Sequence, residues 1–430
     1  MTLRYSATTV DVTPQVGQPM AGYAARGTQT ATEVHDRLTA SLLWLSTDAG
    51  GAVCWVAVDA LGLDVGTATR IRTEVAGQLD MSPDAVLVCC SHTHSGPATW
   101  LRPDGRQASV ADDAAIERLV RTIARGAGRL PATSATATAG WATVADSGVG
   151  ANRYDPAGPH DTSTGVLTLR DADGAVVAVL ADFACHPTVL GHANLAWSAD
   201  YPAAARRVLR AGLAATEDVE TPPVVVFLQG AAGDVSTRFT RRGSTFAEAD
   251  RQGGMLAGAF LRGVLAGSPV PGDTAPVVLR GECTVPTRTL PSAAEAAETV
   301  AAAKEAVTDA DTPEARIAQT RYQGAAMLAA LVSSGLPAEL VLPISVVAFG
   351  DVAWAHLPVE PFTCFGEQIR AGSPFPDTRI VGYTDGYFGY LADDVAHREG
   401  RYEALASMFG PEAGAVVVEA TVELLRRALP

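Results

Sequence analysis

Short apolar runs alternate with amphipathic stretches along most of the chain. The runs are rich in β-branched residues, which predicts strands buried inside an α/β sheet. They lie at 52–63, 86–90, 175–184, 224–228 and 346–358. Apolar residues recur with helical spacing between them. The predicted helices are 64–79, 108–130, 200–213, 246–265 and 411–428. The pattern therefore indicates an α/β fold with a mixed β-sheet flanked by helices.

One part of the chain departs from this alternation. Two alanine-rich stretches with helical spacing, 292–309 and 313–334, follow a β-like segment at 277–290. We interpret 292–334 as an inserted helical hairpin that could cap a site on the sheet. The sequence contains no internal repeat, charge block or low-complexity linker. We therefore expect 1–430 to form a single domain.

Polar side chains with catalytic or metal-binding chemistry stand just after four of the predicted strands. They are His92 and His94, His186, Asp234 and Ser236, and Glu360. Ligand sites of open α/β sheets lie at strand ends, so we expect these residues to converge there. Two imidazoles and a carboxylate suit zinc. The sequence therefore predicts a zinc site at the strand ends.

Simpler interpretations of the same residues stay open. His92 and His94 could form an exposed polar turn, since Gly96 and Pro97 follow them. His186 could simply end a strand, and Glu360 could cap a turn. No G-x-S-x-G elbow is present, and neither a P-loop nor a G-x-G-x-x-G follows a strand. A standard α/β-hydrolase and a nucleotide-binding protein are therefore not supported.

Composition narrows the possible partners and the compartment. The formal net charge of −15 argues against nucleic-acid or anionic-membrane partners. Lys304 is the only lysine, so no lysine nucleophile is expected. The six cysteines form no CxxC pair and read as small buried thiols. No stretch has the length of a membrane span, and the N-terminus has no apolar signal region. We expect a cytoplasmic protein without stable membrane insertion; secretion of a trimmed precursor is the alternative.

Several motifs, taken in order, resemble those of the neutral ceramidase family. The chain has SHTHSGP, a strand ending in HPT, GDVS, LP-x-E, and a tyrosine-rich loop with RYE and GP. An N-terminal HDRL and the pair Asn152-Arg153 also fit. The resemblance covers nearly the whole chain. The chain departs from the family pattern in two motifs: SHTHSGP continues with Ala98-Thr99, and GDVS continues with Thr237-Arg238. Since the sequence ends at Pro430, we also expect no C-terminal immunoglobulin-like domain of the kind found in the ceramidases.

The resemblance implies a site around a single zinc ion. Its ligands would be two histidines, a glutamate and a tyrosine: His92, His186, Glu360 and Tyr390. Three further residues would contact the scissile amide: His94, Arg153 and Tyr402. The serine of GDVS, Ser236, would be either a nucleophile or a substrate anchor.

These motifs predict a zinc-dependent amidohydrolase in which a zinc-activated water attacks an N-acyl amide. We expect His94 and Tyr402 to stabilise the oxyanion or protonate the leaving amine, and Arg153 to hold a substrate oxygen. Ser236 as a covalent nucleophile is less favoured. The substrate would be an N-acyl lipid or a small-molecule amide, and we expect a soluble amide to be cleaved faster than long-chain ceramide. A relative repurposed for a small polar amide, ester or lactam is one alternative, and a non-catalytic zinc-binding protein is another. The oligomeric state is left open.

Overall fold

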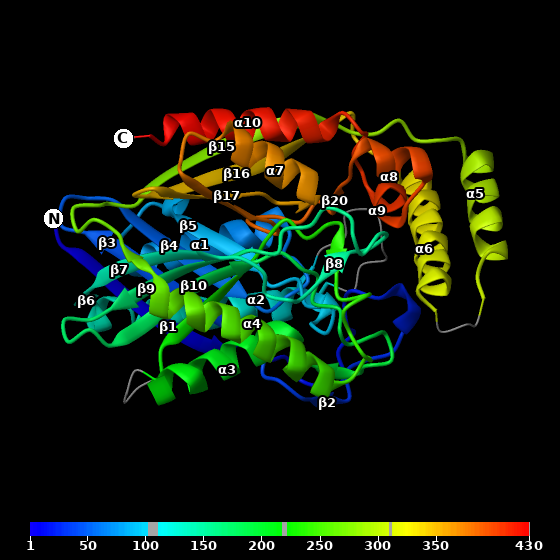
Figure 1. The fold of residues 1–430 in the computed structure, drawn as a ribbon. Helices are drawn as coiled ribbons and strands as arrows, with labels where there is room; N and C mark the ends of the chain where they lie inside the picture. The colour runs from blue at the N-terminus through cyan, green and yellow to red at the C-terminus, as the bar shows by residue number, and fades with distance from the viewer. Residues whose placement is uncertain (102–110, 217–221, 309–311, 430) are drawn as a thin grey trace.

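The computed structural model describes residues 1–101, 111–216, 222–308 and 312–429. Within these ranges the chain is a mixed α/β structure in which the longer strands form three sheets flanked by helices (Figure 1). Two of the sheets have five strands and the third has four. The predicted fold class is therefore confirmed, although the strands are divided among several sheets.

The first sheet has the strand order β5-β4-β3-β1-β6. Its strands are β1 (Leu3–Asp11), β3 (Thr39–Thr47), β4 (Ala52–Val58), β5 (Val86–Cys90) and β6 (Ala135–Thr136). Only β4 and β5 pair in parallel, and α1 (Val65–Leu79) forms the crossover between them. The Asp64 side chain accepts a hydrogen bond from the Thr67 backbone nitrogen and caps α1, as predicted. The apolar faces of α1 and α2 (Asp113–Ala127) pack against this sheet.

The second sheet has the order β12-β10-β9-β7-β14. Its strands are β7 (Thr138–Val144), β9 (Thr164–Arg170), β10 (Val176–Phe183), β12 (Val224–Gln229) and β14 (Ser268–Pro269). Here the parallel pair is β10 and β12, and α3 (Tyr201–Thr216) is the crossover. Helices α3 and α4 (Phe246–Ala266) cover the outer face of the sheet.

The third sheet has the order β15-β16-β17-β19. Its strands are β15 (Val277–Pro286), β16 (Glu339–Phe349), β17 (Val352–His356) and β19 (Asp377–Val381). The parallel pair is β17 and β19, joined through α7 (Thr363–Gly372), and α10 (Ala413–Arg427) packs on the same side. Leu87, Leu180 and Trp354, one from each sheet, meet in one buried cluster. The three sheets therefore share a core, and the loops after their parallel strands can meet.

Three short strand pairs each include at least one strand from the loops that follow the parallel strands. They are β2 (Glu33–Val34) with β11 (Ala196–Trp197), β8 (Ala151–Asn152) with β13 (Val235–Ser236), and β18 (Glu360–Pro361) with β20 (Tyr390–Leu391). Short 3₁₀ helices occur at Ala24–Arg26, Pro83–Ala85, Ala98–Trp100 and Pro131–Thr133.

The predicted helical hairpin is present between β15 and β16. It consists of α5 (Ala293–Glu305) and α6 (Pro313–Ser334). Figure 1 shows it at one end of the molecule, beside α8 (Asp394–Glu399) and α9 (Tyr402–Ala406), with both termini at the other end. Leu328 of α6 packs with Leu405 of α9. The hairpin therefore contacts the short helix that carries Tyr402.

Most predicted elements are confirmed, with shifted ends. The apolar run 52–63, in which the strand was expected to end at Asp59, forms a strand that ends at Val58, and residues 59–63 form a loop that leads to the α1 cap. The start of the helix predicted at 108–130 and residue 309 of the predicted hairpin lie outside the described residues. Helices α7, α8 and α9 were not predicted. The single-domain organisation stays a prediction.

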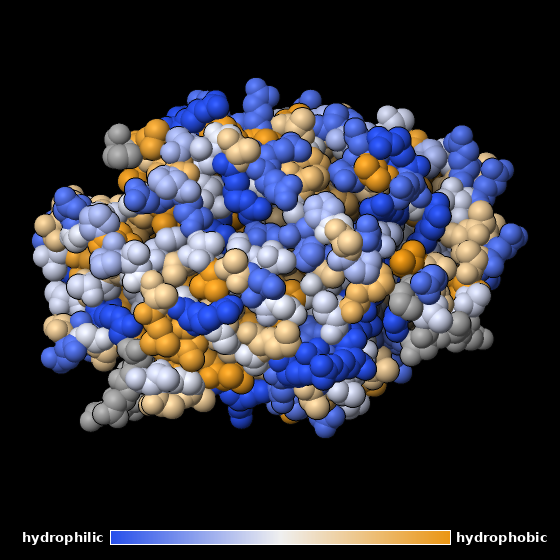
Figure 2. Space-filling view, viewed as in Figure 1, coloured by the Kyte–Doolittle hydropathy of each residue, from blue (hydrophilic) through white to orange (hydrophobic). Residues whose placement is uncertain are grey.

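Among the described residues, no helix is long and apolar enough to cross a membrane. Figure 2 shows hydrophilic and hydrophobic residues interspersed over the visible face. All six cysteines are free, and five of them are buried, as the sequence predicted.

Candidate metal centre

Four residues named as zinc ligands from the sequence come together after strands of different sheets. His92 follows β5, His186 follows β10, and Glu360 opens β18 beyond the end of β17. Tyr390 opens β20, where it pairs in register with Glu360. All four side chains are buried. The crossover connections of the three parallel pairs thus deliver the residues to one place.

The carboxylate of Glu360 lies at the centre of this group. Its Oε2 atom is 3.2 Å from His92 Nε2 and 3.0 Å from His186 Nε2. The Tyr390 hydroxyl is 3.4 Å from His186 Nε2. Two imidazole nitrogens therefore face the glutamate, and the Tyr390 oxygen lies beside one of them.

The other ring nitrogen of each histidine is held by a backbone carbonyl. His92 Nδ1 lies 2.7 Å from the Leu61 oxygen, and His186 Nδ1 lies 2.6 Å from the Ala232 oxygen. His94 Nδ1 lies 3.0 Å from the Gly22 oxygen. A carbonyl oxygen only accepts hydrogen bonds, so Nδ1 carries the proton in each ring. Each Nε2 atom therefore directs a lone pair inward.

His94 belongs to the same cluster. Its Nε2 atom is 3.3 Å from His92 Nε2. Ligand atoms of His92, His94 and His186 all lie within 4.8 Å of one another, a spacing that could hold a metal ion. The geometry thus offers His94 either as a further nitrogen ligand or as a group beside the metal.

Burial favours the uncharged form of His94 and His186. It lowers the pKa of His94 well below its ordinary value, and His92 and His186 add to the effect. Burial, followed by the charge of Arg153, lowers the pKa of His186 to about 4. Burial opposes ionisation of Glu360, but His92 and His186 outweigh it and hold the pKa of the carboxyl well below its usual range.

A cation placed among these inward-facing nitrogen and oxygen atoms would be bound by several of them at once. Imidazole nitrogens and a carboxylate are ligands that a zinc ion accepts. The donor set therefore fits a zinc-type metal.

His92 is held in a strained backbone conformation. Its φ angle is +62°, in the left-handed region that non-glycine residues rarely adopt. Tyr383, whose φ is +55°, stacks on the His92 ring with centroids 4.1 Å apart. Surrounding contacts therefore fix the His92 ring at an energetic cost, as is common at functional sites.

Arg153 lies directly beside this cluster. Its Nη1 atom is 3.2 Å from the Tyr390 hydroxyl and 2.8 Å from Glu403 Oε1. Glu403 is buried, and Tyr154 donates a hydrogen bond to its other oxygen at 2.7 Å. Burial opposes the Arg153 charge, but Tyr390 and Glu403 raise the pKa of the guanidinium well above its usual value. Arg153 is therefore a charged donor held at the edge of the cluster.

The structure places Tyr402 and Ser236 near the cluster but with different neighbours. The Tyr402 ring lies 5.6 Å from the Tyr390 ring, and its hydroxyl is 3.9 Å from the Met327 sulfur of α6. Ser236 is buried in β13, and its Oγ accepts a hydrogen bond from the Arg238 backbone nitrogen at 3.3 Å. Within the described residues, no histidine hydrogen-bonds to Ser236 Oγ.

Sequence reasoning missed three residues of the site. Tyr387 donates a hydrogen bond to Glu360 Oε1 at 2.6 Å, Tyr383 stacks on His92, and Glu403 holds Arg153. Glu403 belongs to the RYE motif, and both tyrosines lie in the tyrosine-rich loop. The motif regions therefore contained the signal, although no spacing identified these individual partners.

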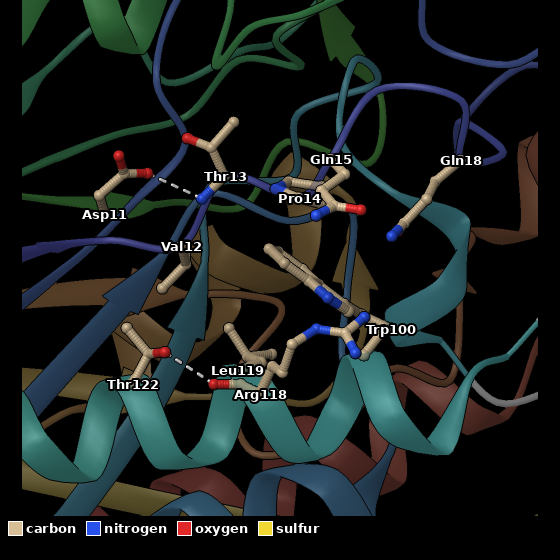
Figure 3. Close-up of a pocket in the computed structure, with 11 residues that line it drawn as sticks. Asp11, Val12, Thr13, Pro14, Gln15, Gln18, Trp100, Arg118, Leu119 and Thr122 are labelled. Atoms are coloured by element: carbon tan, nitrogen blue, oxygen red, sulfur yellow. Dashed lines mark hydrogen bonds between the residues drawn. The ribbon is translucent and has the colours of Figure 1, made fainter.

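A cavity of about 320 Å³ lies away from these residues, between the segment after β1 and helix α2. Figure 3 shows Trp100 and Arg118 side by side within it, with Gln15 and Gln18 above. None of the residues named above as ligands or amide contacts lines this cavity.

Comparison with known proteins identifies the fold. No protein-family model and no curated protein sequence matches the chain. Neutral ceramidase from Pseudomonas aeruginosa matches with a TM-score of 0.78 at 18% identity, over 100% of this chain and 75% of that chain. A structure titled "Ceramidase complexed with C2" matches with a TM-score of 0.78 at 17% identity, over 100% of this chain and 76% of that chain. The chain therefore has a neutral ceramidase-like fold.

Proposed function

We propose that this protein is a zinc-dependent hydrolase of N-acyl amides. One observation carries the proposal: the inward Nε2 atoms of His92 and His186 share Glu360 Oε2, at 3.2 and 3.0 Å, inside a buried site. A cation among these groups would be bound by both imidazoles and the carboxylate. The ceramidase-like fold supports amide hydrolysis as the reaction.

The proposed ligands are His92, His186, Glu360 and Tyr390. When bound there, zinc would polarise the amide carbonyl and lower the pKa of water. The protein's own part is to fix ligand geometry, through the carbonyl bonds to the histidine Nδ1 atoms and the Tyr387 bond to Glu360.

The residues beside the metal would handle the proton and the substrate. His94 is neutral with an inward lone pair, so its Nε2 can accept a proton from the attacking water and later give it to the leaving amine. Arg153 would bind the substrate carbonyl oxygen through its fixed guanidinium. Tyr402 would line the same side, where its ring stands 5.9 Å from the Arg153 guanidinium carbon. Ser236 would anchor substrate, because no base contacts its hydroxyl among the described residues.

His94 as a third nitrogen ligand is the competing assignment, and the close approach of His94 Nε2 to His92 Nε2 favours it. The variant His94→Ala separates the two. A proton-transfer role predicts retained zinc with a kcat loss on the order of 10²-fold or more. A ligand role predicts that zinc is lost together with activity.

The proposed substrate is an amide with an acyl chain, either ceramide-like or smaller and soluble. The test loads the protein with zinc and measures hydrolysis of N-acyl amides of graded chain length, with metal content determined in parallel. We expect about one zinc per chain and amide cleavage that chelation abolishes. A protein that binds zinc but cleaves none of these amides would instead be a zinc-binding relative without turnover, and cleavage only of esters or lactams would indicate a repurposed enzyme.

A further inference from the structure

Three arginines around the site hydrogen-bond to backbone carbonyls instead of carboxylates. Arg26, Arg238 and Arg241 form no ion pair with any carboxylate of the described residues. The buried Arg379, by contrast, has an acidic partner, Asp182, at 2.6 Å. The donor–carbonyl pairs are Arg26 with His94 at 2.6 Å, Arg238 with Arg153 at 2.8 Å, and Arg241 with Val189 at 3.1 Å.

These arginines converge on the His94 side of the metal centre. The Tyr23 ring lies 4.9 Å from the His94 ring and 4.9 Å from the Arg26 guanidinium carbon. Burial raises the pKa of Tyr23 to about 12, while the charges of Arg241, Arg26 and Arg153 act in the opposite direction. Burial lowers the pKa of Arg238 to about 10, and nearby Arg153 adds to that effect. Arg238 therefore lies in the electrostatic field of Arg153 and Arg241.

The nearby carboxylates are already engaged. Glu360 faces the histidines, and Glu403 binds Arg153. Asp200 accepts hydrogen bonds from the backbone nitrogens of Leu190 and Tyr201. Glu403 and Asp200 act on Arg238 and Arg241 only through space, so among the described residues neither of these two guanidinium groups has a directly bound counter-charge. Desolvated cations without a counter-charge are unfavourable, and an arriving anion relieves that cost.

Solvent reaches the centre from this same side. His94 is 8% exposed and Arg153 is 7% exposed, whereas His92, His186 and Glu360 are at most 1% exposed. Arg238 and Arg241 are half-buried. In the part of the chain that the structure describes, no side-chain nitrogen of Arg238 is both buried and without a hydrogen-bond partner. Arg238 also lies in the stretch after GDVS, where the chain departs from the ceramidase motif.

We propose that the amide substrate carries a carboxylate, which Arg238 and Arg241 bind next to the metal centre. The substrate class is then an N-acyl amino acid, whose free carboxylate lies a few bonds from the scissile amide. Guanidinium groups bind carboxylates through paired, charge-assisted hydrogen bonds. In the reaction, water oxygen bonds to the acyl carbon, the C–N bond breaks, and the amino acid leaves with the transferred proton. This inference rests on the proposed amide hydrolase function.

The test compares two substrates that differ mainly in charge: N-octanoylglycine and its neutral counterpart N-octanoylglycinamide. For the zinc-loaded wild type we expect kcat/KM for the acid to exceed that for the amide by about tenfold or more. Arg238→Gln should lower kcat/KM for the acid by about 10- to 100-fold, mainly through KM, because one charge-assisted contact is lost. The same variant should change kcat/KM for the neutral amide by no more than about twofold.

Two further variants keep the result interpretable. Arg238→Lys retains the charge and should recover part of the preference for the acid. Arg242→Gln, at an exposed arginine of the same segment, should leave both substrates unchanged. Equal losses for both substrates in Arg238→Gln would assign Arg238 a structural role and overturn the inference. Wild-type preference for the neutral amide would also overturn it while leaving the amide hydrolase intact, whereas hydrolysis of no amide at all would overturn the proposed function itself.

Discussion

Replacing Tyr387 by phenylalanine isolates one hydrogen bond that supports the metal centre. The Tyr387 hydroxyl donates to Glu360 Oε1 at 2.6 Å, and Glu360 Oε2 is the oxygen that faces the two histidines. The Tyr387 ring lies against Gly62, where an added Cβ would come within 2.6 Å of Tyr387 Cγ. Phenylalanine keeps this packing and removes only the hydroxyl. The change therefore acts on the orientation and charge of the carboxylate.

The expected size follows from the chemistry of that bond. A hydrogen bond to an ionised group contributes about 1.5–3 kcal/mol. Each 1.4 kcal/mol corresponds to about a tenfold change in an equilibrium constant. If the hydroxyl favours the metal-bound geometry of Glu360, zinc affinity should fall by about 10- to 100-fold, which is also the usual effect of removing a partner of a metal ligand.

The assay is a zinc titration against a chromogenic chelator at fixed pH, followed by kcat at saturating zinc. We expect a higher Kd with most of kcat recovered once zinc is saturating. Tyr383→Phe is the matched control, because the Tyr383 hydroxyl is buried and has no hydrogen-bond partner among the described residues. Its ring, which stacks on His92, is kept. A Tyr387→Phe variant whose Kd stays within twofold of that control would refute this account of how Glu360 is held.

Other predictions test the ligands, the serine and a buried acid. Elemental analysis should show that His92→Ala and His186→Ala each lose most of the bound zinc. The control His192→Ala, at an exposed histidine, should keep its zinc. Full zinc retention in both ligand variants would contradict the proposed metal site. Ser236→Ala should retain turnover within about tenfold, with the change mainly in KM, and complete loss of activity would revive the nucleophile mechanism. Burial raises the pKa of Asp200 to about 6, so the folded protein favours the protonated carboxylic acid. The stability that protonated Asp200 contributes is therefore lost as pH rises from about 4 to 6. The Tm of Asp200→Asn minus that of wild type should therefore rise between pH 4.5 and 7, by the equivalent of about 3 kcal/mol at most. A Tm difference that stays constant over this pH range would contradict the raised pKa of Asp200.

The sequence predicted which residues come together in the proposed metal site better than it predicted the contacts that support them. His92, His186 and Glu360 were identifiable because each follows an apolar run, and strand ends of a sheet converge. The bond from Tyr387 to Glu360 and the ion pair of Glu403 with Arg153 depend on how distant loops fold back together, which no local period encodes. Glu403 and Arg153 are 250 positions apart in the chain.

Local signals also explain which elements were missed. Helix α1 was predicted together with its Asp64 cap, whereas α7 begins after Phe362, which provides no side-chain cap. Helix α9 has only five residues, too short for a helical period to be recognised. The left-handed conformation of His92 has no sequence signal either, because surrounding contacts impose it and the residue type does not favour it.

The attachment of the helical hairpin makes it a replaceable module. Pro286 and Glu339 face each other at the ends of the paired strands β15 and β16, so the chain leaves and re-enters the sheet at one point. An insertion there can change in length or sequence without altering the register of the strands. Its inner helix reaches Tyr402, whose hydroxyl lies near Met327, but supplies none of the proposed ligands. Evolution or engineering could therefore remodel this wall and the range of accepted substrates while the chemistry at His92, His186 and Glu360 is inherited unchanged.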